Sequence, residues 1–392
     1  MRSILVYLLG VGFGKIMPLI FSFYVSKMAG NYEYSLLIAF FIKANLLSVI
    51  STISYSQIIF ASKESNAFEL CKYFWHSGIF SLIVSVAGSI WLTEDLDREY
   101  HYLATSAIAF YSFANSLLIL KMAWLNKFLK NSEAGFLVFI TLCITYALGF
   151  ILVGLGVQLT IAMFSASLLF SLVSLFFFLR NRPSGSFFVG RGGAAVLYDS
   201  IPKTMSHIYV MIFAGAFLYS HSLIMSQTIM IEGHAVYAIG YQIFSIGIFL
   251  PGVLGAVLIP RLGMRISKIK LTIINMMIAY LVLTSLWVGG VYWLRMEIFN
   301  WFQIDDGINS MAVLIIMQVA VVAASLNAFL CQYWSSRGDY WLMAVSGVGY
   351  FVFVISCTSF FELSVMNSAI YLLSGYVVAI LFSILARKLA IR

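Results

Sequence analysis

Charge is scarce in this sequence. Of its 392 residues only 10% are Asp, Glu, Lys or Arg, whereas 62% are hydrophobic. Because soluble domains carry about 25% charged residues, these figures exclude a water-soluble domain as the main body of the chain. We therefore expect most of its surface to face lipid.

Cysteine is also scarce, and its pattern excludes two kinds of site. The four cysteines, Cys71, Cys143, Cys331 and Cys357, have no paired spacing and no histidine cluster near them. This pattern indicates that the cysteines pack as apolar residues and form neither a disulfide framework nor a zinc site. We expect no metal and no cofactor. No small-residue cleavage site follows the apolar N-terminal stretch, so we predict an uncleaved first transmembrane helix.

What the chain does have is long apolar runs. A helix needs about 20 apolar residues to cross a bilayer, and twelve segments satisfy this requirement. The sequence therefore predicts an all-α polytopic membrane protein with twelve transmembrane helices. The predicted spans are 4–25, 36–60, 73–92, 103–125, 135–155, 158–179, 204–228, 235–259, 271–294, 311–333, 340–361 and 364–386.

The basic residues predict the orientation. With the N-terminus inside, the cytoplasmic segments hold 17 of the 23 Lys and Arg residues and the outside segments hold three. Since positive residues concentrate in cytoplasmic loops, both termini are expected in the cytoplasm. The net charge of +8 follows from the same bias toward anionic lipid headgroups, and we expect no nucleic-acid partner.

The longest connection divides the spans six and six. We predict an N-terminal six-helix lobe over residues 1–180, a cytoplasmic linker over 181–203, and a C-terminal six-helix lobe over 204–392.

Three residue pairs favour a duplication. Shifting the first half by 203 residues aligns Gly30 with Gly233, Tyr34 with Tyr237, and Phe41 with Phe244. Parallel repeats of this kind place the substrate path between the halves.

Lys15 is the only charged residue between Ile4 and Val25. A charge at the centre of a spanning helix costs about 2.5–3.5 kcal/mol on insertion scales. Lys15 lies about 15 Å from either end of its span, at 1.5 Å per residue, which is beyond the reach of a lysine side chain. We therefore predict that it lines an aqueous cavity and binds substrate.

Other residues of the spans are candidates for binding or bending. Pro18 shares a face with Lys15 and removes a backbone donor, so it predicts a kink, as does Pro251 with Gly252 beside it. Lys43 lies in the second span and is assigned to the cavity, with snorkelling as the alternative; Lys121, near a cytoplasmic span end, favours snorkelling.

Two histidines and two tyrosines complete the candidate binding residues. His207 and His221 are four turns apart on one face of the seventh span. They predict either a proton path or phosphate contact, or helix–helix hydrogen bonds. Tyr237 and Tyr241 form a stripe on the eighth span, which favours either sugar stacking or aromatic packing.

Acidic residues are missing from the interior of every span. Each Asp and Glu lies in a connection or at a span edge. A cavity with fixed cations and no buried anion favours an anionic substrate.

The chain resembles a known family. The segment "YAIGYQIFSIGIFLPGVLGAVLIPRL" (237–262) is similar to the eighth helix of Wzx-type O-antigen and polysaccharide flippases of the multidrug/oligosaccharidyl-lipid/polysaccharide (MOP) exporter superfamily. The glycine- and proline-bearing first helix, "YDSIPKTMSHI" (198–208) and the short loops are similar too. The resemblance implies a MATE-like fold.

It also implies a function. We expect a flippase of the bacterial inner membrane, which moves an undecaprenyl-diphosphate-linked oligosaccharide by alternating access. Its other expected partners are membrane lipids, a coupling ion (proton or sodium) and polysaccharide-assembly proteins. We expect no catalytic residue and no enzyme activity. The alternatives are a MATE-type drug antiporter, a polysaccharide polymerase or ligase, and a flippase for the peptidoglycan precursor. A polymerase or ligase usually has a large outside loop that carries catalytic residues, and a peptidoglycan-precursor flippase usually has two further helices. Neither feature is expected from this sequence.

Overall fold

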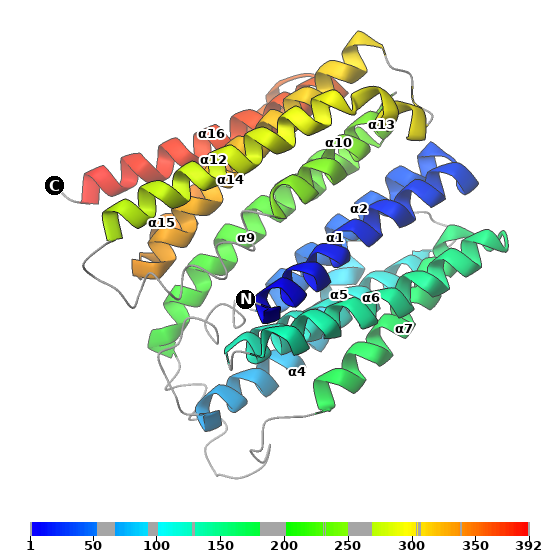
Figure 1. Cartoon of the computed structure of the whole chain (residues 1–392), viewed down its shortest axis with the longest axis horizontal. Helices are drawn as coiled ribbons and strands as arrows, with labels where there is room; N and C mark the ends of the chain where they lie inside the picture. The colour runs from blue at the N-terminus through cyan, green and yellow to red at the C-terminus, as the bar shows by residue number, and fades with distance from the viewer. Residues whose placement is uncertain are drawn as a thin grey trace. The chain divides into compact units, whose positions relative to one another are not determined.

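All regular structure in the described part of the chain is α-helical (Figure 1). The computed structural model describes residues 2–52, 67–92, 101–127, 130–180, 201–229, 231, 233–249, 269–302, 304, 307–337 and 339–390. The helices in these ranges are α1 (Arg2–Ala29), α2 (Asn31–Ser51), α4 (Ala67–Leu92), α5 (His101–Lys127), α6 (Asn131–Gly154), α7 (Leu159–Leu179), α9 (Ile201–Thr228), α10 (His234–Gly247), α12 (Ile269–Trp293), α13 (Arg295–Phe302), α14 (Ile308–Arg337), α15 (Tyr340–Phe360) and α16 (Val365–Ala390).

The all-helical, multi-span architecture is confirmed, but the count of twelve spans is not. Among the described residues eight helices are long and apolar enough to cross a membrane, and a ninth span would join α12 to α13 across a 60° bend. Parts of the predicted spans 36–60 and 235–259 lie outside the described residues. The sequence predicted only a connection after the ninth span, whereas residues 295–302 form helix α13 beyond the bend.

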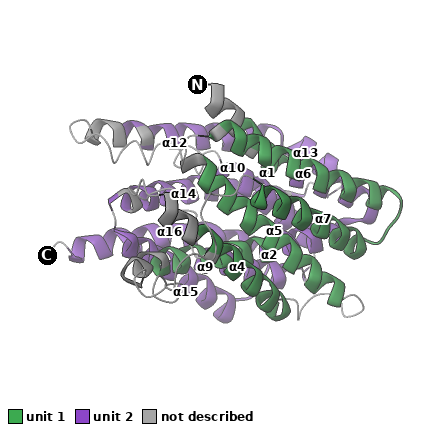
Figure 2. Ribbon diagram, turned by 90° about the horizontal axis from the view of Figure 1, so that it is seen from below, with its two compact units in different colours: residues 1–17, 43–215 green, residues 18–42, 216–392 purple. Residues whose placement is uncertain are grey.

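The helices form two compact units, shown in Figure 2. Unit 1 consists of residues 1–17 and 43–215, and unit 2 of residues 18–42 and 216–392. The predicted six-plus-six division places 18–42 in the first lobe, whereas here this segment groups with the second half of the chain. The lobe boundaries remain a prediction.

Two glycines aligned by the predicted repeat have the same backbone conformation. Gly30 (φ 99°) immediately precedes α2, and Gly233 (φ 81°) immediately precedes α10. A positive φ is accessible to glycine without steric penalty, so glycine permits the sharp reversal before each helix. Tyr34 and Tyr237, which follow at the same spacing, are both fully buried.

Glycine also allows a close helix contact within unit 1. A Cβ atom on Gly10 of α1 would collide with the carbonyl oxygen of Gly135 on α6. One turn further along, Phe13 packs on Phe139 with ring centroids 4.6 Å apart. Small residues let membrane helices approach this closely, so the pair of glycines brings α1 against α6.

Serines join α2, α4 and α5 in unit 1. The Ser48 hydroxyl donates to the Ser112 carbonyl at 3.2 Å, and the Ser116 hydroxyl donates to the Ser48 carbonyl at 3.3 Å. The hydroxyls of Ser51 and Ser116 also bond to each other. We name the six buried serines of this contact the serine seam: Ser48, Ser51, Ser77, Ser81, Ser112 and Ser116.

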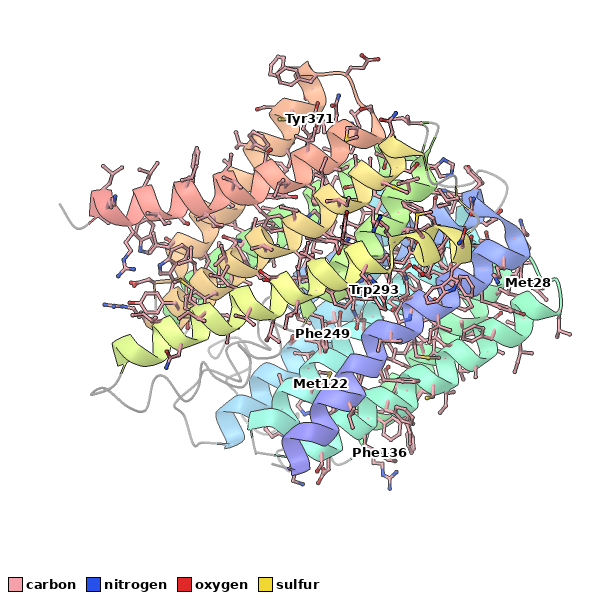
Figure 3. The ribbon with its side chains drawn as sticks, turned by 45° about the horizontal axis from the view of Figure 1, so that its top comes forward. Met28, Met122, Phe136, Phe249, Trp293 and Tyr371 are labelled. Atoms are coloured by element: carbon pink, nitrogen blue, oxygen red, sulfur yellow. The ribbon has the colours of Figure 1, made fainter. Side chains whose placement is uncertain are left out.

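Large apolar side chains cover the outward faces of the helices. Phe136 on α6 is 60% exposed and Trp293 at the end of α12 is 77% exposed; both are labelled in Figure 3, where Phe136 projects away from its helix. Exposed apolar surface of this extent matches a lipid environment rather than water.

Candidate functional site

A hydrogen-bonded cluster around His221 lies at the centre of the candidate site. Its Nε2 atom lies 3.0 Å from the Tyr350 hydroxyl and 3.4 Å from the Tyr376 hydroxyl. Its Nδ1 atom lies 3.1 Å from the Tyr241 hydroxyl. These four residues, the His221 cluster, come from four helices of unit 2, namely α9, α10, α15 and α16.

Aromatic rings enclose the His221 cluster. His221 itself is 3% exposed. Phe217, one turn before it on α9, stacks on Tyr350 with ring centroids 4.3 Å apart. Phe244 of α10 meets the imidazole edge-on at 6.2 Å. The ring therefore has apolar walls and hydroxyl groups at both nitrogens.

A glycine on α16 makes room for one of the tyrosines. A Cβ atom on Gly375 would lie 2.7 Å from the ring of Tyr350. Any larger residue there would push the Tyr350 hydroxyl away from the imidazole, so Gly375 is part of how the cluster is built.

Tyr237 lies one turn before Tyr241 on α10. Its ring stacks on that of Tyr241, with centroids 6.5 Å apart. The Tyr237 hydroxyl is buried and makes no hydrogen bond to any described residue. Tyr237 therefore contributes a ring contact, rather than a hydrogen bond, to its described neighbours.

A second polar network joins α1, α2 and α10 within unit 2. The Tyr34 hydroxyl donates to Gln242 Oε1 at 3.0 Å, and Gln242 Nε2 donates to the Ser22 hydroxyl at 3.0 Å. Ser22 in turn donates to the Pro18 carbonyl at 2.6 Å. Gln242 is thus satisfied by two helices distant from it in sequence, and Pro18 lies at the end of this chain of bonds.

Several predicted site residues lie outside the described part of the structure. The side chains of Lys15 and His207 are not described, although both positions lie in helices, α1 and α9. Pro251 lies outside the described residues altogether. Pro18 lies inside α1, and the division between the two units falls immediately before it.

Lys43 is described, and it is buried. Its Nζ atom donates to the carbonyl of Leu92, the last residue of α4, at 2.9 Å, and only 3% of the residue is exposed. The last carbonyls of a helix lack intrahelical donors, and a cation stabilises a helix C-terminus. In this conformation Lys43 caps α4, so its predicted role in binding substrate would require this bond to open.

Lys121 makes the same kind of contact with another helix. Its Nζ atom donates at 2.9 Å to the carbonyl of Arg180, which caps the C-terminus of α7. Only 5% of Lys121 is exposed, and its ammonium donates to the carbonyl at the end of α7. Snorkelling toward the headgroups stays a prediction.

No described Asp or Glu is buried. The buried ionisable side chains in the described ranges, cysteine and tyrosine aside, are Lys43, Lys121 and His221. Nor do the described His, Cys, Asp and Glu residues form any group that could hold a metal ion.

Sequence reasoning did not single out Gln242, Tyr350 or Tyr376. Tyrosines are frequent in this chain, and nothing in their spacing indicates which of them meet His221. Gln242 could have been found from the sequence, because a side-chain amide in a membrane helix requires a hydrogen-bond partner on another helix.

Solved structures provide the comparison with known proteins. No protein-family model matches this chain, and no curated protein matches it. A MOP superfamily transporter from Pyrococcus furiosus, whose binding pocket is described as reversed in polarity, matches at 14% identity with a TM-score of 0.62, over 99% of this chain and 94% of its own.

MATE transporters match equally well. An inward-facing multidrug resistance MATE family transporter matches at 15% identity with a TM-score of 0.62, over 98% of this chain and 97% of its own. A MATE in complex with MaL6 matches at 15% identity with a TM-score of 0.63, over 99% and 94%. At these identities the matches establish the fold alone: the chain has the MATE-like fold seen in MOP superfamily transporters, and its apolar helices are those of a multi-pass membrane protein.

Proposed function

We propose that this protein is a flippase that moves a polyprenyl-diphosphate-linked oligosaccharide, an O-antigen repeat unit, across the bacterial inner membrane. One observation carries the proposal. The chain has a transporter fold, and its described buried residues include the bases Lys43, Lys121 and His221 but no Asp or Glu. A fixed positive charge along the path attracts anions and repels cations, and a diphosphate is the anion that a lipid-linked sugar carries.

Lys15 is the residue that we assign first to the diphosphate, with Lys43 and His207 as further contacts. Lys15 has no acidic neighbour in its span, so a substrate anion would supply the missing counter-charge. Tyr237, Tyr241 and His221 would reach a sugar only after their aromatic surroundings open, because all three are buried here.

The proposed mechanism is alternating access between an N-terminal lobe (1–180) and a C-terminal lobe (204–392). The glycan and diphosphate would cross through water while the polyprenyl tail stays in lipid. Pro18 and Pro251 are the proposed hinges. In support of the first, Pro18 has no N–H to donate within α1, and the two units divide at this residue.

The rival function is a drug antiporter, because multidrug MATE transporters share the fold. The absence of a carboxylate from the described buried residues counts against a cationic drug, which would meet no compensating negative charge. The Pyrococcus furiosus transporter, with its reversed pocket polarity suggesting a different function, is a precedent for a change of substrate on this fold.

Deleting the gene tests the proposal. We expect complete loss of surface polysaccharide, with lipid-linked repeat units accumulating on the cytoplasmic face and drug susceptibility nearly unchanged. Surface glycan length is the measurement. Single repeat units still reaching the surface would instead indicate a polymerase, and an unchanged surface with raised drug sensitivity would indicate the antiporter.

A further inference from the structure

A cavity of about 430 Å³ in unit 2 lies between α12 and α14, with Arg295 at one end. Its volume is within the range of sites that bind small molecules. We propose that it binds one anionic phospholipid of the leaflet in which α12 ends, with the lipid phosphate at Arg295 and an acyl chain in the cavity. This site goes beyond the proposed function and is independent of what the protein transports.

The cavity follows one face of α12. The residues of α12 that line it include Ser285, Val288, Gly289 and Tyr292, which stand at positions i, i+3, i+4 and i+7 and so share a face. From Ser285 to Tyr292 the helix rises about 10 Å, at 1.5 Å per residue. That is most of the ~15 Å that one leaflet contributes to the hydrocarbon core of a bilayer. The cavity therefore has the length of a stretch of acyl chain.

The walls between the two ends of the cavity are aliphatic. They are formed by Val288 and Val291 of α12 and by Leu314 and Ile315 of α14. Gln318 is the polar exception, but both of its polar atoms already bond to protein. Its Oε1 accepts from Trp287 Nε1 at 3.1 Å, and its Nε2 donates to the Gly240 carbonyl at 3.2 Å. A hydrocarbon chain suits these walls, because it buries apolar surface and needs no hydrogen bond.

Gly289 leaves room in the cavity. Glycine weakens a helix relative to alanine, so its presence within α12 calls for a reason. On α10 the reason is packing, because a Cβ on Gly240 would collide with the side chain of Met317. A Cβ on Gly289 would meet no described atom within 4 Å. No described neighbour therefore requires glycine at this position, and space for a ligand is the role that remains for it.

Arg295 is held in place with most of its donors unused. Its Nη1 atom donates to the Tyr292 carbonyl at 2.6 Å, and its guanidinium carbon lies 4.3 Å from the centroid of the Tyr292 ring. One of five N–H donors is thus occupied. Arg295 forms no ion pair with any residue in the described ranges, and Glu297 does not share its face, since helical residues two apart diverge. Arginine in this state can bind phosphate oxygens through two parallel hydrogen bonds.

Exposed aromatic residues indicate that this end of α12 lies at the membrane surface. Trp293, labelled in Figure 3, is 77% exposed and Tyr292 is 53% exposed. Tryptophan and tyrosine concentrate at the level of the lipid headgroups. Arg295, at the 60° bend between α12 and α13, is therefore at the depth of lipid phosphates, and the cavity is at the depth of their chains.

Charge distinguishes a phospholipid from the other phosphate-bearing ligands. Arg295 is the one basic residue among those that line the cavity. A single arginine matches the one negative charge of a phosphodiester, whereas a polyprenyl diphosphate carries more charge than it can neutralise. Inorganic phosphate would contact Arg295 but would leave the aliphatic walls without a ligand.

The test is native mass spectrometry of the purified full-length protein in detergent, with palmitoyl-oleoyl-phosphatidylglycerol as the probe. We expect the wild type to bind one molecule about tenfold more tightly than the zwitterionic phosphatidylcholine of the same chains, the scale of one hydrogen bond to a charged group. Arg295→Gln should remove this preference. The matched control is Arg387→Gln, because the Arg387 guanidinium also lies over a tyrosine ring, 5.5 Å from the Tyr333 centroid, but does not line the cavity.

A second pair of variants tests the cavity itself and still decides the matter if Arg295→Gln fails to fold. Gly289→Leu should fill the cavity and abolish binding of phosphatidylglycerol. Gly290→Leu adds the same bulk at the next position, which also meets no described atom within 4 Å but does not line the cavity, and should bind as the wild type does.

Three results would overturn the phospholipid site. Equal binding of phosphatidylglycerol by the wild type and Gly289→Leu would show that the lipid attaches elsewhere on the surface. Displacement of the lipid by an excess of inorganic phosphate would show a site for a free anion. Binding of undecaprenyl diphosphate without binding of phosphatidylglycerol would assign the cavity to the proposed substrate instead.

Discussion

Buried polar side chains join the helices in both units, but the residue types differ. In unit 1, helices α4 and α5 meet the part of α2 from Lys43 onward through the serine seam, in which short hydroxyls donate to the backbone of a neighbouring helix. Helices α9, α10, α15 and α16 of unit 2 meet through His221 and three tyrosines. The first arrangement contains no ionisable side chain, and the second is centred on a buried histidine.

This difference indicates a division of labour. Contacts between small side chains and backbone change little with pH or ligand, which suits a rigid scaffold. A buried network of one imidazole and three hydroxyls depends on every member being bonded, so the loss of one partner destabilises the surrounding helix contacts. The predictions below test whether unit 1 depends on close packing and unit 2 on its polar cluster.

The largest effect should come from the glycine contact in unit 1. Gly10→Leu places a side chain where even a Cβ would collide with the Gly135 carbonyl oxygen, so we expect loss of folded protein. The measurement is the monodisperse fraction in size-exclusion chromatography. The control is Gly289→Ala in unit 2, where a Cβ meets no atom within 4 Å; a normal yield of Gly10→Leu would refute the packing argument.

Next in size is the effect of removing the charge on Lys15, which lies in the part of α1 that belongs to unit 1. Lys15→Ala should reduce transport at least tenfold while insertion remains intact, since removing the charge lowers the cost of insertion by about 2.5–3.5 kcal/mol. Lys15→Arg should keep partial function, because the charge is retained. Surface polysaccharide at matched expression is the measurement, and normal levels in Lys15→Ala would contradict the assigned role.

His221→Phe tests unit 2 through stability. The substitution keeps a ring but removes both nitrogens, which leaves the hydroxyls of Tyr241, Tyr350 and Tyr376 without their partner. We expect a loss of about 2–4 kcal/mol, since each buried unsatisfied group costs about 1–3 kcal/mol and the tyrosines can regain part of this by bonding to one another. Thermal unfolding in detergent measures it, and an unchanged midpoint would show that these bonds contribute nothing.

The smallest effect is expected in the serine seam. Ser116→Ala removes a hydroxyl whose one proton lies within reach of the Ser112 carbonyl at 2.7 Å and the Ser48 carbonyl at 3.3 Å, and which also bonds to the Ser51 hydroxyl. Interhelical hydrogen bonds in membranes contribute about 0.6 kcal/mol on average, so the midpoint should fall only slightly. Ser116→Leu, which also adds bulk, should destabilise far more. If alanine and leucine were equally harmful, hydrogen bonding rather than close approach would hold unit 1 together.

Features with a local cause could be predicted from the sequence. The all-helical fold follows from apolar runs, and the reversals before α2 and α10 follow from Gly30 and Gly233, whose positive φ angles other residues rarely adopt. Contacts with distant causes could not. Nothing near Lys121 in the sequence indicates that the end of α7 lies within its reach, and nothing near Tyr376 indicates His221. Such partners are set by how helices pack, and many arrangements bury the same apolar faces.

The most direct test of the proposed function compares two probes in the same proteoliposomes. One is the fluorescent undecaprenyl-diphosphate-linked N-acetylglucosamine, and the other is ethidium, a cationic dye. The proposed position of Lys15 on the substrate path, with no carboxylate among the described buried residues, predicts that the anionic lipid crosses and ethidium does not. Lys15→Ala should abolish movement of the lipid. Transport of ethidium without movement of the lipid would contradict the account and identify a drug exporter.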